Sequence, residues 1–203
     1  MKKILKQTIR WTIFISVVTF ILAAIFTVLS TIALNGVGWI VGLAIVLVIV
    51  LIGIFFDMIG IAATAANEVP FHAMASNRIH GAKQSIRIIR NADRFASFCN
   101  DVIGDISGIV SGTATALVIV QLTVSYNWGA GSVAENVSSI FLTSLIAALT
   151  VGGKAIGKTF AIRYSKDIIF GVGKLLYFLE ENFNIVIMKD NKKKPSKKKT
   201  KRK

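Results

Sequence analysis

The chain has 203 residues, of which 54% are hydrophobic and 17% are charged, and its formal net charge is +14. Soluble domains usually carry about 25% charged residues, so this composition argues against a soluble enzyme and for a membrane protein. The abundance of large aliphatic residues excludes intrinsic disorder for most of the chain, and the single cysteine, Cys99, excludes an intramolecular disulfide.

Four uncharged apolar stretches predict four transmembrane helices. No charged side chain lies between Arg10 and Asp57, and this stretch is too long for one crossing, which takes about 20 residues. The Asn35-Gly36 step interrupts it and predicts a tight turn between two helices. We therefore expect an all-α integral membrane bundle that spans the bilayer with residues 11–34, 39–61, 103–124 and 137–155.

The distribution of Lys and Arg predicts the orientation of these spans. The loops 35–38 and 125–136 hold none of the 24 basic residues, which all fall on the other side of a four-span arrangement. Loops rich in Lys and Arg stay in the cytoplasm, so we expect a multi-pass protein of the cell membrane with both termini in the cytoplasm. The first apolar run exceeds the roughly 7–15 residues of a signal-peptide core, so we expect it to be retained as a helix.

The polar loop between the second and third spans has a helical pattern. One face is apolar and a separate face is basic. The apolar face holds Ile79, Ala82, Ile86 and Ile89, and the basic face holds Lys83, Arg87, Arg90 and Arg94. Two interpretations stay open: a juxtamembrane amphipathic helix in the cytoplasmic interface, or a soluble hairpin packed under the spans. Residues 163–188 have a similar apolar spacing, which predicts a helix on the membrane or against a partner helix, such as a second copy.

Lys and Arg dominate the last fifteen residues, 189–203. Such a tail cannot form a core, so we expect disorder beyond a membrane domain that comprises residues 1–188. Anionic lipid is the expected partner, at about 1 kcal/mol for each basic residue near the surface. Nucleic acid is less favoured, because no aromatic residue is interleaved for base stacking. The candidate lipid-binding residues are Lys192, Lys193, Lys194, Lys197, Lys198 and Lys199.

Small residues recur every four positions in the third span, at Gly104, Gly108 and Gly112. This spacing lets helices approach closely. We therefore expect helix packing or a homodimer along this face, in preference to a glycine-lined pathway.

Charged residues occur at the inner ends of three spans. Asp57 ends the second span, Asp101 and Asp105 begin the third, and Lys154 ends the fourth, so all four lie at a similar depth. One interpretation is a salt bridge or side chains that extend to the interface. The other is a polar cavity, open to the cytoplasm, whose carboxylates suit Mg²⁺.

We expect no enzyme. His72 and His80 lack the neighbouring acid of a zinc-protease motif. The segment 152–159 ends in Gly157-Lys158-Thr159 and has the glycine spacing of a P-loop, but it follows an expected membrane span instead of the strand that a P-loop requires.

Four short motifs occur in order along the chain. They are Phe-Phe-Asp-Met-Ile-Gly at 55–60, Asn-Ala-Asp-Arg-Phe-Ala-Ser at 91–97, Ile-Gly-Asp at 103–105 and Gly-Lys-Ala-Ile-Gly-Lys-Thr-Phe-Ala-Ile-Arg-Tyr at 153–164. Together they resemble the transmembrane domain of the CNNM/CorB/CorC family of magnesium transport and efflux proteins. The resemblance covers roughly residues 39–181, makes 11–34 an added helix, and leaves the family's CBS domains without a counterpart here.

The resemblance implies a role in divalent-cation homeostasis, with Mg²⁺ as the expected ion. It also implies metal-site positions at Asp57 and Asp105, where the family has Ser and Asn, while Lys154 replaces a cation-binding Glu. Two hypotheses follow. The first is a CNNM/CorC-like protein of magnesium homeostasis, transport included. The second is a non-transporting membrane scaffold or regulator of the same fold that acts through its polybasic tail. A cation site requires that the Lys154 ammonium point away from both carboxylates.

Overall fold

The structure is a computed structural model that describes residues 2–129 and 131–183, and side chains from Ile9 onward. It confirms the all-α prediction, since the described residues form helices and turns without a strand. The helices are α1 (Lys2–Leu34), α2 (Trp39–Ala65), α3 (Val69–Ser76), α4 (Ala82–Arg90), α5 (Ala92–Ser97), the π-helix η1 (Phe98–Gly104), α6 (Asp105–Ser125), α7 (Val133–Arg163) and α8 (Ser165–Phe183). The polybasic residues Lys192 to Lys199 lie outside the described part of the chain.

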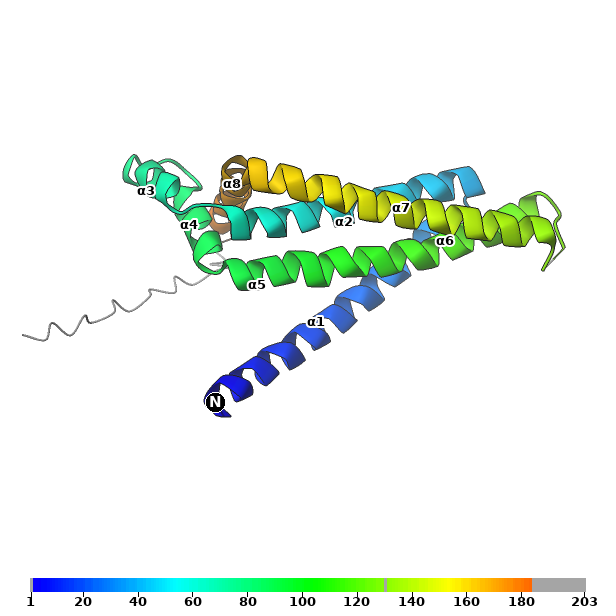
Figure 1. Cartoon of the computed structure of the whole chain (residues 1–203), viewed down its shortest axis with the longest axis horizontal. Coiled ribbons are helices and arrows are strands. Elements are labelled where there is room, and N and C mark those ends of the chain that lie inside the picture. Colours follow the sequence, from blue (N-terminus) through cyan, green and yellow to red (C-terminus); the bar gives the residue numbers. More distant parts are fainter. Residues whose placement is uncertain (1, 130, 184–203) are drawn as a thin grey trace, which may run out of the picture.

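Four helical segments are long and apolar enough to cross a membrane, as expected. They are Ile9–Leu34, Trp39–Ala65, Ala92–Ser125 and Val133–Arg163. Each contains its predicted span but is longer, because a helix ends where its backbone hydrogen bonds end and not where its side chains become polar. The third segment begins well before its predicted span, since α5, η1 and α6 form one continuous rod (Figure 1).

The four segments run antiparallel (Figure 1). The α1–α2 and α6–α7 loops lie at one end of the bundle, and α3, α4 and α8 lie at the other. We call this second end the basic end. The predicted turn after the first span is present, with Gly36 at a positive φ of 80°. Helices α2, α6 and α7 lie together, and α1 crosses them obliquely, with its N-terminal half diverging from the rest.

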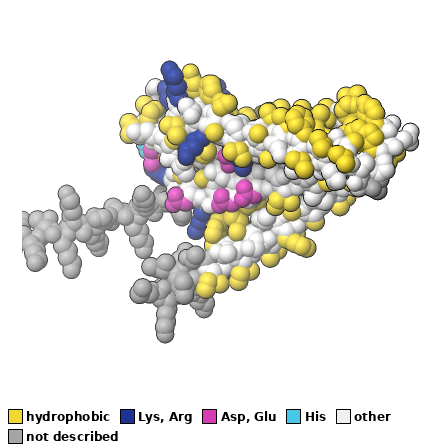
Figure 2. Space-filling model, turned by 45° about the vertical axis from the view of Figure 1, so that its right-hand side comes forward, with side chains coloured by type: hydrophobic (Ala, Val, Ile, Leu, Met, Phe, Trp, Pro, Cys, Tyr) yellow, Lys and Arg dark blue, Asp and Glu magenta, His cyan; other side chains and the backbone are white. Residues whose placement is uncertain are grey.

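Large apolar side chains fill the bundle and also cover its outside. Val46 and Val50 of α2, Ala114 and Val118 of α6, and Ile146 of α7 form a buried cluster with Leu34. Helix α1 contributes few buried residues, and apolar side chains cover its outer face (Figure 2). Exposed apolar surface of this extent is what a lipid environment accommodates.

The loop between the second and third spans folds as a helical hairpin, α3 followed by α4, under the ends of the spans. It shares one buried core with the spans and with α8, formed by Ala62, Ala63, Phe71, Ile86, Ile88, Ala161 and Ile169. Of the two open interpretations, the packed hairpin is therefore the one that the fold favours. The prediction of an apolar helix face is wrong at Ile79, which lies in the turn before α4 and is 41% exposed. This turn contains Arg78 and Gly81 at positive φ and interrupts the helical periodicity.

Helix α8 packs against α4 of the same chain, so the predicted apolar face of this segment does not need a second copy. Ile169 is fully buried, and the Ser85 hydroxyl donates a hydrogen bond to its carbonyl at 3.1 Å. Arg87 and Gln84 of α4 both donate to the Glu180 carboxylate of α8, at 3.0 and 2.8 Å. The predicted basic face of α4 is thereby partly neutralised within the fold.

Candidate functional site

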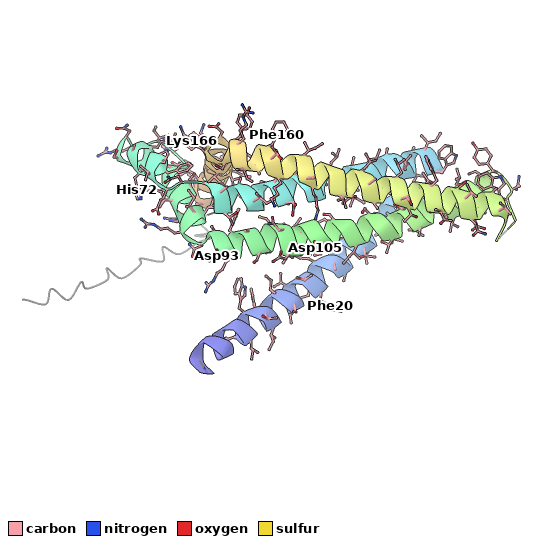
Figure 3. The ribbon with its side chains drawn as sticks, in the orientation of Figure 1. Phe20, His72, Asp93, Asp105, Phe160 and Lys166 are labelled. Carbon is pink, nitrogen blue, oxygen red and sulfur yellow. The ribbon has the colours of Figure 1, made fainter. Side chains whose placement is uncertain are left out.

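Three charged side chains from three helices meet toward the basic end of the bundle. The Lys154 ammonium of α7 lies 3.9 Å from an Asp57 carboxylate oxygen of α2 and 3.9 Å from an Asp105 carboxylate oxygen of α6. Asp105 lies on the third rod, with Asp93 nearer the basic end (Figure 3). Asp101 is exposed and is not a partner of Lys154. The structure therefore brings together three of the four residues predicted to share this depth.

Glycines create the room in which these side chains meet. A Cβ atom at Gly104 would lie 3.4 Å from the Asp57 carboxylate and 3.6 Å from the Lys154 ammonium. At Gly153, a Cβ atom would overlap the Ile54 side chain, so the absence of a side chain lets α7 lie against α2. The helix contact at Gly153 thereby holds the neighbouring Lys154 next to Asp57.

The π-helix η1 leads directly into the site and was not predicted. Its Asn100 amide fills the space that a side chain at Gly60 of α2 would occupy. The Asn100 Oδ1 atom is buried and has no hydrogen-bond partner among the described residues. Single π-turns occur frequently at functional sites because they change the direction of the side chains that follow. No local sequence pattern signals this π-helix, because the packing of Asn100 against Gly60 joins two distant segments of the chain.

The two ion pairs differ in strength because their carboxylates differ in exposure. The side chains of Asp57, Lys154 and Asp105 are 16%, 27% and 68% exposed, respectively. Two unit charges at this distance attract by about 4 kcal/mol at an effective dielectric constant of about 20, and solvent screening lowers this value for exposed groups. The Asp57–Lys154 pair is therefore the stronger one. At 3.9 Å neither contact is a hydrogen bond.

The cluster has the composition of an ion-paired site and not that of a complete metal site. Carboxylate oxygens suit Mg²⁺, which takes six oxygen ligands at about 2.0–2.1 Å. The described residues contain no group of three or more His, Cys, Asp and Glu side chains that could hold a metal ion. Asp57 and Asp105 supply two carboxylates, and the third charged group of the cluster is the Lys154 ammonium.

The predicted glycine face makes close contacts only at Gly104. Nothing lies within 4 Å of a Cβ atom built at Gly108 or Gly112, so the prediction of helix packing within the chain is wrong at these two positions. The close contacts involve Gly53 and Gly60 of α2 instead, which meet Ser107 and Asn100. A homodimer through Gly108 and Gly112 stays a prediction.

The histidines and the Gly-Lys-Thr segment lie apart from this cluster. His72 on α3 contacts Glu68 at 2.8 Å, and the His80 ring lies 4.8 Å from the Tyr177 ring. Gly157, Lys158 and Thr159 lie inside α7 and not in a loop after a strand, as a P-loop would. The comparisons with family models, curated proteins and solved structures found no match for this chain, so the resemblance of its four motifs stays a prediction.

Proposed function

We propose that this chain is a membrane scaffold or regulator of CNNM/CorC-like fold in which Lys154 is the resident cation of the Asp57–Asp105 pair. The position of the Lys154 ammonium, 3.9 Å from both carboxylates, carries this proposal. By the resemblance, Lys154 stands where a cation-binding Glu is expected. The protein therefore holds its own positive charge where the family would bind an ion.

This arrangement opposes the binding of Mg²⁺. A dication that approaches the two carboxylates meets like-charge repulsion from the ammonium, and it must also lose part of a tightly held hydration shell. Displacing Lys154 leaves a positive charge at the inner end of a membrane span, which is costly unless the side chain reaches the interface. We therefore expect weak or no Mg²⁺ binding by the unmodified chain.

Magnesium homeostasis, transport included, is the second candidate function. The convergence of Asp57 and Asp105 from different helices, together with the 68% exposure of the Asp105 side chain, favours it. This function requires the Lys154 side chain to turn away from both carboxylates when the ion binds.

Calorimetric titration of the purified full chain with Mg²⁺ distinguishes the two candidates. Lys154→Glu should create or strengthen binding, because three carboxylates would then share one site. Lys158→Glu is the matched control, since it makes the same charge change at an exposed position of α7 outside the cluster. Tight binding by the unmodified chain and none by Lys154→Glu would overturn the proposal. Magnesium flux into liposomes by the unmodified chain would then support transport.

We place the basic end of the bundle in the cytoplasm, in a protein of the cell membrane. The concentration of Lys and Arg at this end, and their absence from the two loops at the other end, support this orientation. A reporter fused after Trp128 should lie outside the cell, and one fused after Tyr177 should lie inside. The opposite result at either position would contradict the orientation.

A further inference from the structure

A cavity of about 260 Å³ lies at the basic end, away from the Lys154 cluster. It opens where α3, the following turn and the beginning of α4 meet α8. No acidic residue belongs to its lining, which consists of Ala75, Arg78, Ile79, His80, Gly81, Lys83, Gln84 and Tyr177. The cavity therefore combines two permanent cations with an imidazole and an apolar wall.

The cations of this cavity are not neutralised by the fold. Neither Arg78 nor Lys83 forms an ion pair with any residue that the structure describes, and both are exposed. Two carboxylates of α8 that contact the cavity lining have other partners. Glu180 accepts hydrogen bonds from Gln84 and Arg87, and Glu181 interacts with the Tyr177 hydroxyl. The positive charge of the cavity is thus available to a ligand.

A second cavity provides an internal comparison. It measures about 240 Å³, shares Lys83 with the first, and is also lined by His72, Ile86, Arg87 and Arg90. Its charges are largely balanced, because Arg87 pairs with Glu180 at 3.0 Å and Glu68 lies 2.6 Å from Arg90 and 2.8 Å from His72. Two neighbouring cavities of similar size therefore differ in net charge, because the first has Arg78, which forms no ion pair among the described residues, in addition to the shared Lys83.

The shape of the first cavity limits what it can hold. Pockets for drug-sized ligands measure about 300–1,000 Å³, so a cavity of about 260 Å³ suits a smaller group. Arg and Lys side chains are the usual partners of phosphate oxygens, because charged hydrogen bonds are short and strong. The His80 and Tyr177 rings, 4.8 Å apart, form a wall that an alcohol or acyl portion of the ligand can contact.

We propose that Arg78 and Lys83, together with His80, form a binding site for a phosphate-bearing headgroup at the basic end of the bundle. The ligand is a phosphate monoester, supplied by an anionic phospholipid or by a small soluble phosphate ester. Arg78 and Lys83 contact its phosphate oxygens, and Ile79 and Tyr177 contact its less polar part. The site is independent of the Lys154 cluster and of the polybasic tail.

Binding to the full chain in detergent tests this site with defined probes. The probes are dioleoyl phosphatidate in mixed micelles, with phosphatidylcholine as its neutral reference, the soluble ester glycerol 3-phosphate, and inorganic phosphate. The chain has two histidines, so the nuclear magnetic resonance signal of His80 reports on the cavity and that of His72 is an internal reference. A tail that binds lipid by charge alone would not shift the His80 signal selectively.

Arg78→Gln/Lys83→Gln should weaken phosphatidate binding about tenfold, because two charged contacts are lost. The matched control is Lys158→Gln/Lys166→Gln, which removes the same charge from exposed positions outside the cavity and should bind like the parent. The charge-preserving Arg78→Lys/Lys83→Arg should retain most of the affinity.

The outcomes distinguish a lipid ligand from a soluble one and test whether the site exists. A selective His80 shift with phosphatidate alone supports a lipid headgroup, and a shift with glycerol 3-phosphate as well supports a soluble ester. No selective His80 shift with any probe would overturn the proposal. Equal phosphatidate affinity in the parent, the cavity variant and the control would also overturn it.

Discussion

Two sets of glycines in the bundle have opposite surroundings. Gly53 and Gly60 of α2 face neighbouring segments so closely that a Cβ atom would lie 2.8 Å from Ser107 at the first and would overlap Asn100 at the second. Gly108 and Gly112 of α6 face open space. The second pair has the spacing that favours helix contacts, but the first pair makes them. A small residue permits a close approach, and the complementary side chain on the neighbouring helix decides whether it occurs.

The largest effect is expected for Gly60→Leu. Its side chain has no space unless Asn100 and the π-helix move, and overpacking of this kind costs about 3 kcal/mol or more. Unfolding of the purified protein in mixed micelles, followed by circular dichroism, measures the change. Gly108→Leu is the matched control, because it adds the same side chain to a membrane helix with nothing nearby. Equal stability of the two variants would contradict the difference in packing between Gly60 and Gly108.

A smaller effect, of about 2 kcal/mol, is expected for Gly53→Ala, because one methyl group must displace the Ser107 side chain. A second substitution, at the opposing residue, should restore part of the lost stability. Ser107→Gly removes the opposing Cβ atom, so the double variant should be more stable than the sum of the two single changes implies. Additive free energies of unfolding would show that the cost arises elsewhere.

The smallest effect is expected for Gly108→Leu on the stability of the monomer, within about 0.5 kcal/mol, as for other changes at open positions. This face is available to a second copy, so the same variant should reduce any homodimer. Light scattering of the protein in micelles measures the mass of the complex. A dimer that persists in Gly108→Leu would place the interface on another surface.

Hydropathy and charge predicted much of this molecule, because lipid restricts the chain to a few solutions. An antiparallel arrangement of four spans brings the ends of α2, α6 and α7 to one depth, so Asp57, Asp105 and Lys154 could be grouped from the sequence. Depth alone does not determine which side chains face each other around the bundle. The contact at Gly153, which sets the position of Lys154, depends on Ile54 of another helix.

Local patterns failed where the structure depends on contacts between distant segments. The π-helix at Phe98–Gly104 is accompanied by the packing of Asn100 against Gly60, and neither residue alone predicts it. The apolar spacing that begins at Ile79 suggested one continuous helix face. The chain instead turns at Arg78 and Gly81, where the backbone of α8 lies too close to Gly81 for any side chain. The cavity beside this turn could not be predicted for the same reason.

The loose attachment of α1 has a consequence for the order in which the protein assembles. Its inner side packs against Val102, Ile106 and Val110, and Gln121 of α6 donates a hydrogen bond to the Leu34 carbonyl at 2.8 Å. Ribosomes add about 5–20 residues per second, so on the order of several seconds pass between the synthesis of α1 and that of its partners. The apolar outer surface of α1 is compatible with contact with lipid during this interval. Helix α1 therefore precedes the helices that it packs against in the order of synthesis, and it can pack against them only after they are made.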